Sequence, residues 1–173
     1  MAFFRIKKIK GNEYVYIVEN EWKGKGSRQK VKGYIGRAYR LELKNDVDFT
    51  AHLKIVDVDG FIEKNDFKKI VEYLIEWELF KFCISRQEFF IDFDGKIVQK
   101  NKKNAVLLIN DGFLCSITLR NLLEFKPENE ETDAYRLARA FVEAGIKVPQ
   151  DFFVRLFEKL YKHTEKPKSD FEW

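Results

Sequence analysis

The sequence predicts an α+β fold, in which a basic three-stranded N-terminal meander precedes a central helix, a further antiparallel hairpin region and a C-terminal helical part. Three observations lead to this prediction. Runs of β-branched and aromatic residues, separated by Gly and Asn turn signals, come first in the chain. Helical spacing of apolar residues dominates the last third. The strands and helices do not alternate as βαβ units, which argues against a parallel α/β sheet.

The N-terminal strands are the first elements in this scheme. Strands are expected over residues 3–9, 13–20 and 28–36, with a turn at Gly11-Asn12 and a flexible basic tip over residues 23–27. Residues 49–58 alternate between apolar and polar side chains, which favours another strand. The dipeptide Asp59-Gly60 then indicates a turn.

The rest of the chain is expected to form a helix, hairpins and further helices. A core helix is expected over residues 65–83 with Asn65 as its N-cap, followed by a hairpin over residues 88–99, a buried strand over 105–109 and a turn at 110–112. Further helices are expected over 118–125, with Ser116 or Thr118 as a cap, from Thr132 or Asp133 to Ala144, and from Pro149 onwards. Ala138 and Val142 are expected to face inward, and Gly145 is expected to stop the second of these helices.

Length and composition indicate one globular domain with small appendages. The chain has 173 residues, of which 45% are hydrophobic and 35% charged. We expect a basic β-hairpin module over residues 1–40, an α+β core over 41–162 and a flexible tail over 163–173. Neither a secretory signal nor an apolar run of membrane-spanning length is recognisable, so a cytoplasmic location is expected. Cys83 and Cys115 are expected to be core residues and not a disulfide framework.

Charge is distributed unevenly along the chain. Residues 1–40 contain eleven Lys or Arg and three Glu, a net charge of +8. The whole chain carries +4, so the remainder carries −4. Such a concentration of positive potential attracts phosphate backbones, and aromatic rings among the cations can stack on unpaired bases. A solvated basic face without a partner, with Tyr and Val that merely build a strand, is the alternative interpretation.

The candidate nucleic-acid-binding residues are the cations and aromatic residues of this module. They are Lys7, Lys8, Lys10, Tyr14, Tyr16, Trp22, Lys23, Lys25, Arg28, Lys30, Lys32 and Arg37, and Tyr34 is a further aromatic residue among the cations. RNA is slightly favoured over DNA, because the module offers no recognition helix for a major groove, whereas an aromatic strand surface suits unpaired RNA.

The same segment resembles a known module. The stretches Glu13–Glu19, Arg28–Val31 and Tyr34–Arg37, together with the basic turn between them, are similar to the N-terminal hairpin ahead of some insertion-sequence transposases and to the start of some archaeal Fic-type proteins. The resemblance covers residues 5–37. No transposase-sized catalytic domain fits in this chain, and the Fic signature is missing. The resemblance therefore implies a substrate-recruiting module without the enzyme that usually follows it.

Catalytic and metal-binding signals are weak by comparison. Three acidic turns, at residues 57–60, 92–95 and 110–112, could hold Mg²⁺ in a small nuclease, but Asp-Gly is also the ordinary hairpin turn signal. His52 and His163 have no Cys at metal-ligand spacing, so neither zinc nor any other cofactor is expected. No phosphate-binding loop leads into a helix.

Three functions follow as hypotheses. The first is a non-enzymatic nucleic-acid-binding protein, of which a ribosome-associated factor is one form. The second is a protein–protein interaction adaptor that docks through its acidic helical part and the tail residues Phe171 and Trp173. The third is the small metal-dependent nuclease. Oligomeric state does not follow from the sequence, and no membrane partner is expected.

Overall fold

The computed structural model describes residues 2–24 and 26–162, and it has the α+β architecture that the sequence predicts. Seven strands form a mixed sheet: β1 (Ala2–Ile9), β2 (Asn12–Lys23), β3 (Gly26–Arg40), β4 (Phe90–Asp92), β5 (Ile97–Lys100), β6 (Lys103–Ile109) and β7 (Gly112–Leu114). Six helices complete the described part: α1 (Phe49–Leu53), α2 (Val58–Lys64), α3 (Phe67–Lys81), α4 (Ser116–Leu123), α5 (Glu130–Ala144) and α6 (Gln150–Lys162).

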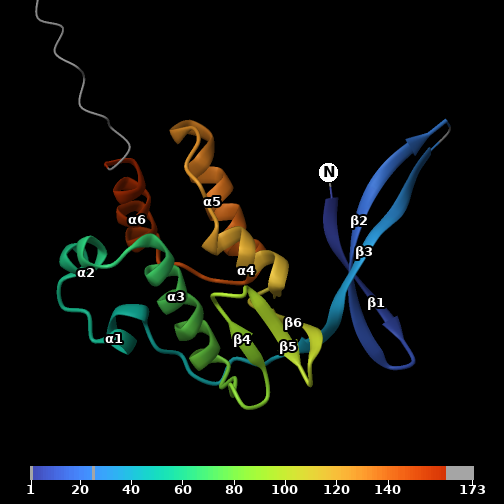
Figure 1. The fold of residues 1–173 in the computed structure, drawn as a ribbon, viewed down its shortest axis with the longest axis horizontal. Helices are drawn as coiled ribbons and strands as arrows, with labels where there is room; N and C mark the ends of the chain where they lie inside the picture. The colour runs from blue at the N-terminus through green and yellow to red at the C-terminus, as the bar shows by residue number, and fades with distance from the viewer. Residues whose placement is uncertain (1, 25, 163–173) are drawn as a thin grey trace, which may run out of the picture.

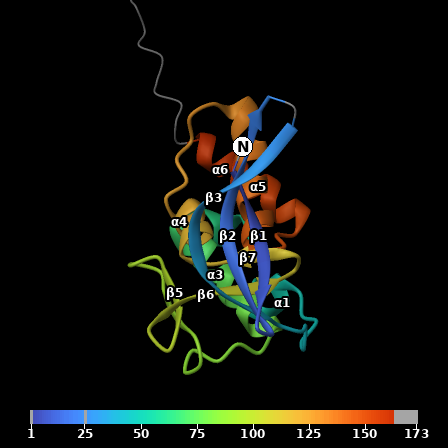
Figure 2. The ribbon, with the colours of Figure 1, turned by 90° about the vertical axis from the view of Figure 1, so that its right-hand side faces the viewer.

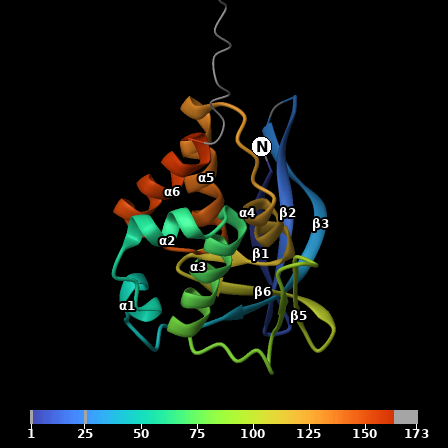
Figure 3. The same ribbon diagram turned by 60° about the vertical axis from the view of Figure 1, so that its left-hand side comes forward.

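The strands run in the order β1-β2-β3-β6-β5-β4, and β7 pairs with β6. All pairings are antiparallel except that of β3 with β6, which is parallel and joins Arg37–Arg40 to Ala105–Leu108. Strands β1, β2 and most of β3 stand apart from the helices as a three-stranded meander (Figure 1), which we call the wing (residues 2–40). The rest of the molecule is called the body. In Figure 3 the helices lie on one side and the wing strands on the other.

The main core lies between the helices and the body strands. Helix α3 supplies the fully buried Ile70, Val71, Leu74 and Ile75, as its helical spacing predicts. A cluster of edge-on aromatic contacts surrounds the buried Phe49, whose ring centroid is 5.4 Å from that of Trp77 and 4.9 Å from that of Phe152. This cluster joins α1 and α3 to α6, which are far apart in the sequence.

The expected strand over residues 49–58 is wrong. Residues 49–53 form helix α1, because the Asp48 side chain accepts hydrogen bonds from the amides of Thr50 and Ala51 and so caps a helix start. The expected turn at Asp59-Gly60 lies inside helix α2. Asp57 caps that helix by accepting a hydrogen bond from the Gly60 amide at 3.0 Å. Capping and burial of Phe49 override the alternating pattern here.

Several local expectations also need correction. Asp66, not Asn65, caps α3, and Asn65 instead ends α2. Helix α5 starts earlier than expected, with Asn129 as its N-cap. Its Val142 is 69% exposed and does not face inward. Cys83 is exposed, because it follows the end of α3 in a left-handed backbone conformation, whereas Cys115 is buried as expected.

Other turn predictions are confirmed. The hairpin between β4 and β5 turns at Asp94-Gly95, and that between β6 and β7 turns at Asn110-Asp111, where both residues have positive φ. Gly145 ends α5 with a φ of 76°. The expected cap of α4 is wrong: Cys115 is its N-cap, and Thr118 is the third residue of the helix, where its hydroxyl accepts a hydrogen bond from the Cys115 amide at 3.0 Å. Ser116 is the first residue of α4, and its hydroxyl accepts a hydrogen bond from the Val98 amide. The tail residues 163–173, which include Phe171 and Trp173, lie outside the described residues.

Candidate nucleic-acid interface

The pairing register of the wing assigns each side chain to one of two faces. Paired residues on neighbouring strands share a face, and successive residues alternate between the two. Val15 pairs with Ile6 and Gly36, whereas Tyr16 pairs with Arg5 and Tyr34. One face, here called the inner face, carries Phe4, Ile6, Val15 and Ile17. The other, here called the outer face, carries Phe3, Arg5, Lys7, Ile9, Tyr14, Tyr16, Val18, Trp22, Gln29, Val31, Tyr34 and Arg37.

Two β-bulges in β3 shape this arrangement. The register between β2 and β3 shifts between Val15 and Tyr16 and again between Ile17 and Val18, which leaves Ile35 and Lys32 without a partner in the ladder. A bulge bends its strand, increases the local twist and re-aims neighbouring side chains. The bulge at Ile35 interrupts the alternation along β3, so Tyr34 lies on the same face as Arg37, the outer face.

The inner face of the wing attaches it to the body. Val15, Ile35 and Ala38 form a small core with Val106 and Cys115. The Phe4 ring packs against Phe113 of β7 with a centroid distance of 5.1 Å. Beyond this contact, a cleft of about 410 Å³ separates the wing from α4 and α5. The inner face is therefore mainly structural where it meets the body.

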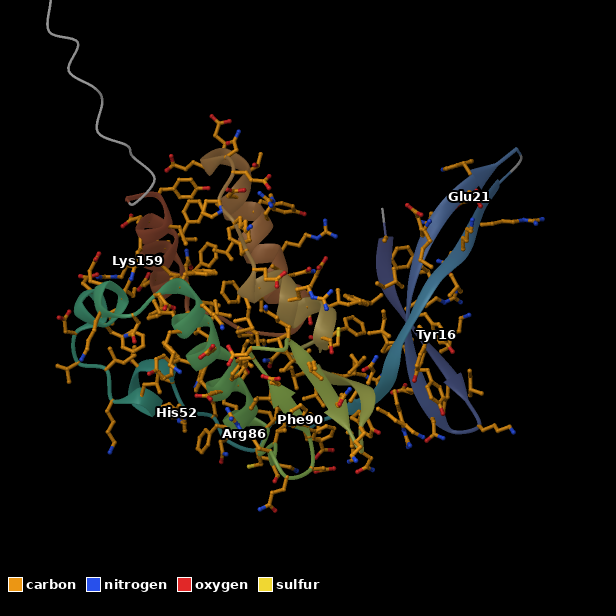
Figure 4. All side chains as sticks on the ribbon, viewed as in Figure 1. Tyr16, Glu21, His52, Arg86, Phe90 and Lys159 are labelled. Atoms are coloured by element: carbon orange, nitrogen blue, oxygen red, sulfur yellow. The ribbon has the colours of Figure 1, made fainter. Side chains whose placement is uncertain are left out.

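The outer face carries a cluster of three tyrosines. The ring of Tyr34 lies 5.4 Å from that of Tyr16 and 6.3 Å from that of Tyr14, with interplanar angles of 57° and 50°. Tyr16 lies midway along the wing in Figure 4. Partial burial and the two neighbouring tyrosines raise the pKa of Tyr34. Tyr34 nevertheless stays 54% exposed. In Figure 2 the three wing strands lie in front of the helices, so no helix of the described chain covers this side.

Three cations surround the tyrosine cluster. The Lys7 ammonium lies 4.9 Å from the centre of the Tyr16 ring, a cation–π contact. The Arg37 guanidinium donates a hydrogen bond of 2.6 Å to the Asn12 side chain. The Arg5 guanidinium reaches across β2 to donate to Gln29. None of the ion pairs between described residues involves these three cations, so their charge is available to an anionic ligand.

The wing carboxylates Glu13 and Glu19 form ion pairs within the wing. Glu13 and Arg40 form an ion pair of 2.7 Å, and Glu19 and Lys32 one of 3.0 Å. Hydrogen bonds from these cations lower the pKa of both carboxyl groups. Pairing within the wing therefore occupies Lys32, a candidate residue, but among the described residues it involves none of the three outer-face cations.

The predicted binding residues are only partly brought together. Lys7, Tyr14, Tyr16, Trp22 and Arg37 share the outer face. By register, Lys8, Arg28 and Lys30 belong to the inner face, and Lys10 lies in the β1–β2 turn with a φ of 50°. Lys25 and the Lys23 side chain are not among the described parts of the chain. The twelve candidates thus do not form one surface.

Sequence reasoning missed neighbours that only the sheet assembles. Tyr39 lies in the part of β3 that pairs with β6 and is therefore close to the body. The centre of its ring lies 5.3 Å from the Arg37 guanidinium carbon. There the Lys100 ammonium lies 4.8 Å from the Tyr39 ring centre and also pairs with Glu88. Arg5 is one of the eleven cations of residues 1–40 but is not among the predicted site residues. Two-residue alternation could have placed Arg5 and Tyr39 on the outer face, but no sequence signal points to Lys100.

The acidic turns take structural roles. Asp57 caps α2, Asp94 pairs with Lys68 at 2.8 Å, and Asp59 pairs with Arg155. Within residues 2–24 and 26–162, no three His, Cys, Asp or Glu side chains come together in a way that could hold a metal ion.

The buried carboxylates are fully bonded. Asp133 accepts hydrogen bonds from the amides of Glu128 and Asn129, from Arg136 and from the Tyr161 hydroxyl. Burial opposes its ionisation, but these bonds outweigh burial and lower the pKa of Asp133 to about 2. Glu78 accepts from Asn110, from the Lys147 amide and from Lys81. Such groups tie elements together.

Comparison of the chain with models of protein families, with curated proteins and with solved structures found no match. The resemblance of residues 5–37 to transposase-associated and Fic-type modules therefore stays an expectation from the sequence. None of the helices in the described chain is both long and apolar enough to cross a membrane.

Proposed function

We propose that this protein is a non-enzymatic nucleic-acid-binding protein, with RNA favoured over DNA, and that the outer face of the wing is its binding surface. The observation that carries the proposal is the placement of Tyr14, Tyr16 and Tyr34 among Arg5, Lys7 and Arg37 on one uncovered sheet face. Cations hold phosphates through counterion release, and aromatic rings stack on bases.

The balance of charge supports the same proposal. Residues 1–40 carry a net charge of +8 on a small meander, in which Glu13 pairs with Arg40 and Glu19 with Lys32. A sheet surface with exposed rings is suited to RNA, whose sequence-specific recognition mostly involves unstacked bases. A ribosome-associated factor is one form of this function, and co-sedimentation of the protein with ribosomes at low and high salt would test it.

The binding surface is tested by fluorescence anisotropy with mixed-sequence RNA and DNA oligonucleotides. The double variant Lys7→Gln/Arg37→Gln removes two cations from the outer face and should weaken binding at least tenfold. Lys64→Gln is a matched control, because Lys64 is an exposed lysine on α2, at the opposite end of the molecule from the wing (Figure 1), without an ion pair among described residues. Absence of binding to both nucleic acids, or equal binding by the double variant, would refute the proposal.

A second candidate function is an interaction adaptor. Helix α5 exposes Tyr135 at 71% and Val142 at 69%, seven residues apart and hence on one side of the helix. Exposed apolar residues on a common side of a helix favour a protein partner. Affinity capture would compare the unchanged chain with Tyr135→Ser/Val142→Ser and with a chain lacking residues 164–173. A partner that both variants retain would refute the adaptor function.

A further inference from the structure

We infer that the outer face binds single-stranded nucleic acid, with unpaired bases stacked on Tyr34 and Trp22 and with phosphates held by Arg5, Lys7 and Arg37. This inference rests on the proposed function and specifies the class of ligand. The ligand must be a form of nucleic acid whose base faces are accessible, and the base faces of a continuous duplex are not.

Apolar exposure is concentrated on the outer face. Twelve large hydrophobic residues of the described chain are exposed, and five of them belong to this face by register: Phe3, Ile9, Trp22, Val31 and Tyr34. Phe3, at the end of β1, also lines the cleft towards α4 and α5. Trp22 is 79% exposed and Tyr34 54%. The cations of the outer face lie between and beside these residues. A ligand that covers the face must therefore present flat apolar rings and negative charge together.

Unpaired nucleotides meet both requirements. Every base has a π-face that can stack on Trp or Tyr, and every nucleotide carries a phosphate. In a duplex, the base faces are covered by neighbouring base pairs, so only phosphates and groove edges remain accessible. Duplex binding would thus use Arg5, Lys7 and Arg37 but would leave Trp22 and Tyr34 in water.

An anionic membrane surface is the other ligand with apolar and negative groups. The outer face does not offer the common plane that such a surface requires. The rings of Tyr14 and Tyr16 are inclined by 50° and 57° to that of Tyr34, and the two bulges increase the twist of the strands. A flexible single strand can follow a twisted surface base by base.

The strand geometry sets the length of the site. Tyr14 and Trp22 are eight residues apart on β2, which corresponds to about 27 Å at about 3.3–3.4 Å per residue. About eight nucleotides cover this length at a stacked rise of about 3.4 Å, and fewer cover it when the strand is extended. Affinity should therefore rise with oligonucleotide length and reach a plateau by about eight nucleotides.

Anisotropy titrations with the full chain test the inference. The probes are 4-, 8- and 12-nucleotide RNA and DNA single strands, the 12-nucleotide strand annealed to its complement, and vesicles of anionic phospholipid. Trp22→Ala and Tyr34→Ala should each weaken single-strand binding by about 5- to 150-fold, the range expected for loss of one base–aromatic stack. Trp22→Phe and Tyr34→Phe should restore most of the affinity. Phe90→Ala is the matched control, because Phe90 is 56% exposed on β4, which β5 and β6 separate from the wing strand β3, and it lies apart from Tyr16 in Figure 4.

The outcomes separate the inference from the proposed function. Preference for the single strand, with loss on both Ala substitutions and not on Phe90→Ala, supports the inference. Equal affinity for the duplex, with no effect of the Ala substitutions but a loss on Lys7→Gln/Arg37→Gln, overturns the inference and leaves the proposed function standing. Binding to vesicles alone, or to no probe, overturns both. Circular dichroism of each variant checks that the wing stays folded.

Discussion

Replacement of one outer-face lysine should change the salt dependence of binding by a calculable amount. For a single strand, the slope of log affinity against log salt is about −0.7 per phosphate contact. Arg5, Lys7 and Arg37 are the outer-face cations, and none of them forms an ion pair with another described residue, so three contacts give a slope of about −2.1. Between about 50 and 200 mM salt, the affinity should then fall about 18-fold. Lys7→Gln removes one contact, which lowers the slope to about −1.4 and the fall to about sevenfold.

The assay is an anisotropy titration of a 12-nucleotide single strand at four salt concentrations, with Lys64→Gln as the control that keeps the slope near −2.1. An unchanged slope in Lys7→Gln would refute the phosphate contact of Lys7. A slope of the unchanged protein near −4.9 would mean that about four phosphate contacts are made in addition to those of Arg5, Lys7 and Arg37, and would contradict a site confined to the outer face.

Two further predictions concern the body. Tyr161→Phe removes a hydrogen bond to the buried Asp133 and should lower the free energy of unfolding by about 1–2 kcal/mol in urea titrations at pH 7. The pKa of Asp133 is lowered from 3.8 to about 2, so its contribution to stability is present above pH 3.8 and lost as the pH falls towards 2. Asp133→Asn should abolish this part of the acid dependence, and an unchanged acid profile would contradict the assignment. Gly145→Ala should lower the free energy of unfolding by about 1–3 kcal/mol or more. Gly145 has a φ of +76°, and a Cβ there would lie 2.2 Å from the Ile109 carbonyl oxygen. Gly33→Ala, with no atom within 4 Å of its Cβ position, is the control; equal thermal stability of the two variants would refute this reasoning.

Local signals in the sequence predict the elements correctly where the apolar pattern and the turn residues agree. The three wing strands, helix α3 and the hairpin turns at Asp94-Gly95 and Asn110-Asp111 follow from periodicity and turn residues, and the structure confirms them. The strand prediction for residues 49–58 is wrong, because their alternation matches a strand whereas Asp48 and Asp57 cap two short helices. The burial of Phe49 against Trp77 and Phe152 depends on residues that lie up to about a hundred positions away, which no local pattern contains.

By itself, the sequence determined that a basic, aromatic, three-stranded module begins this chain, because charge and β-propensity are local properties of residues 1–40. Tertiary structure alone decided which of those residues face the same way. The bulges at Ile35 and Lys32 set the register that brings Tyr34 beside Tyr14 and Tyr16. A shift of one residue in pairing moves a side chain to the opposite face, so the division of the cations between the two faces depends on hydrogen bonds between strands and not on composition.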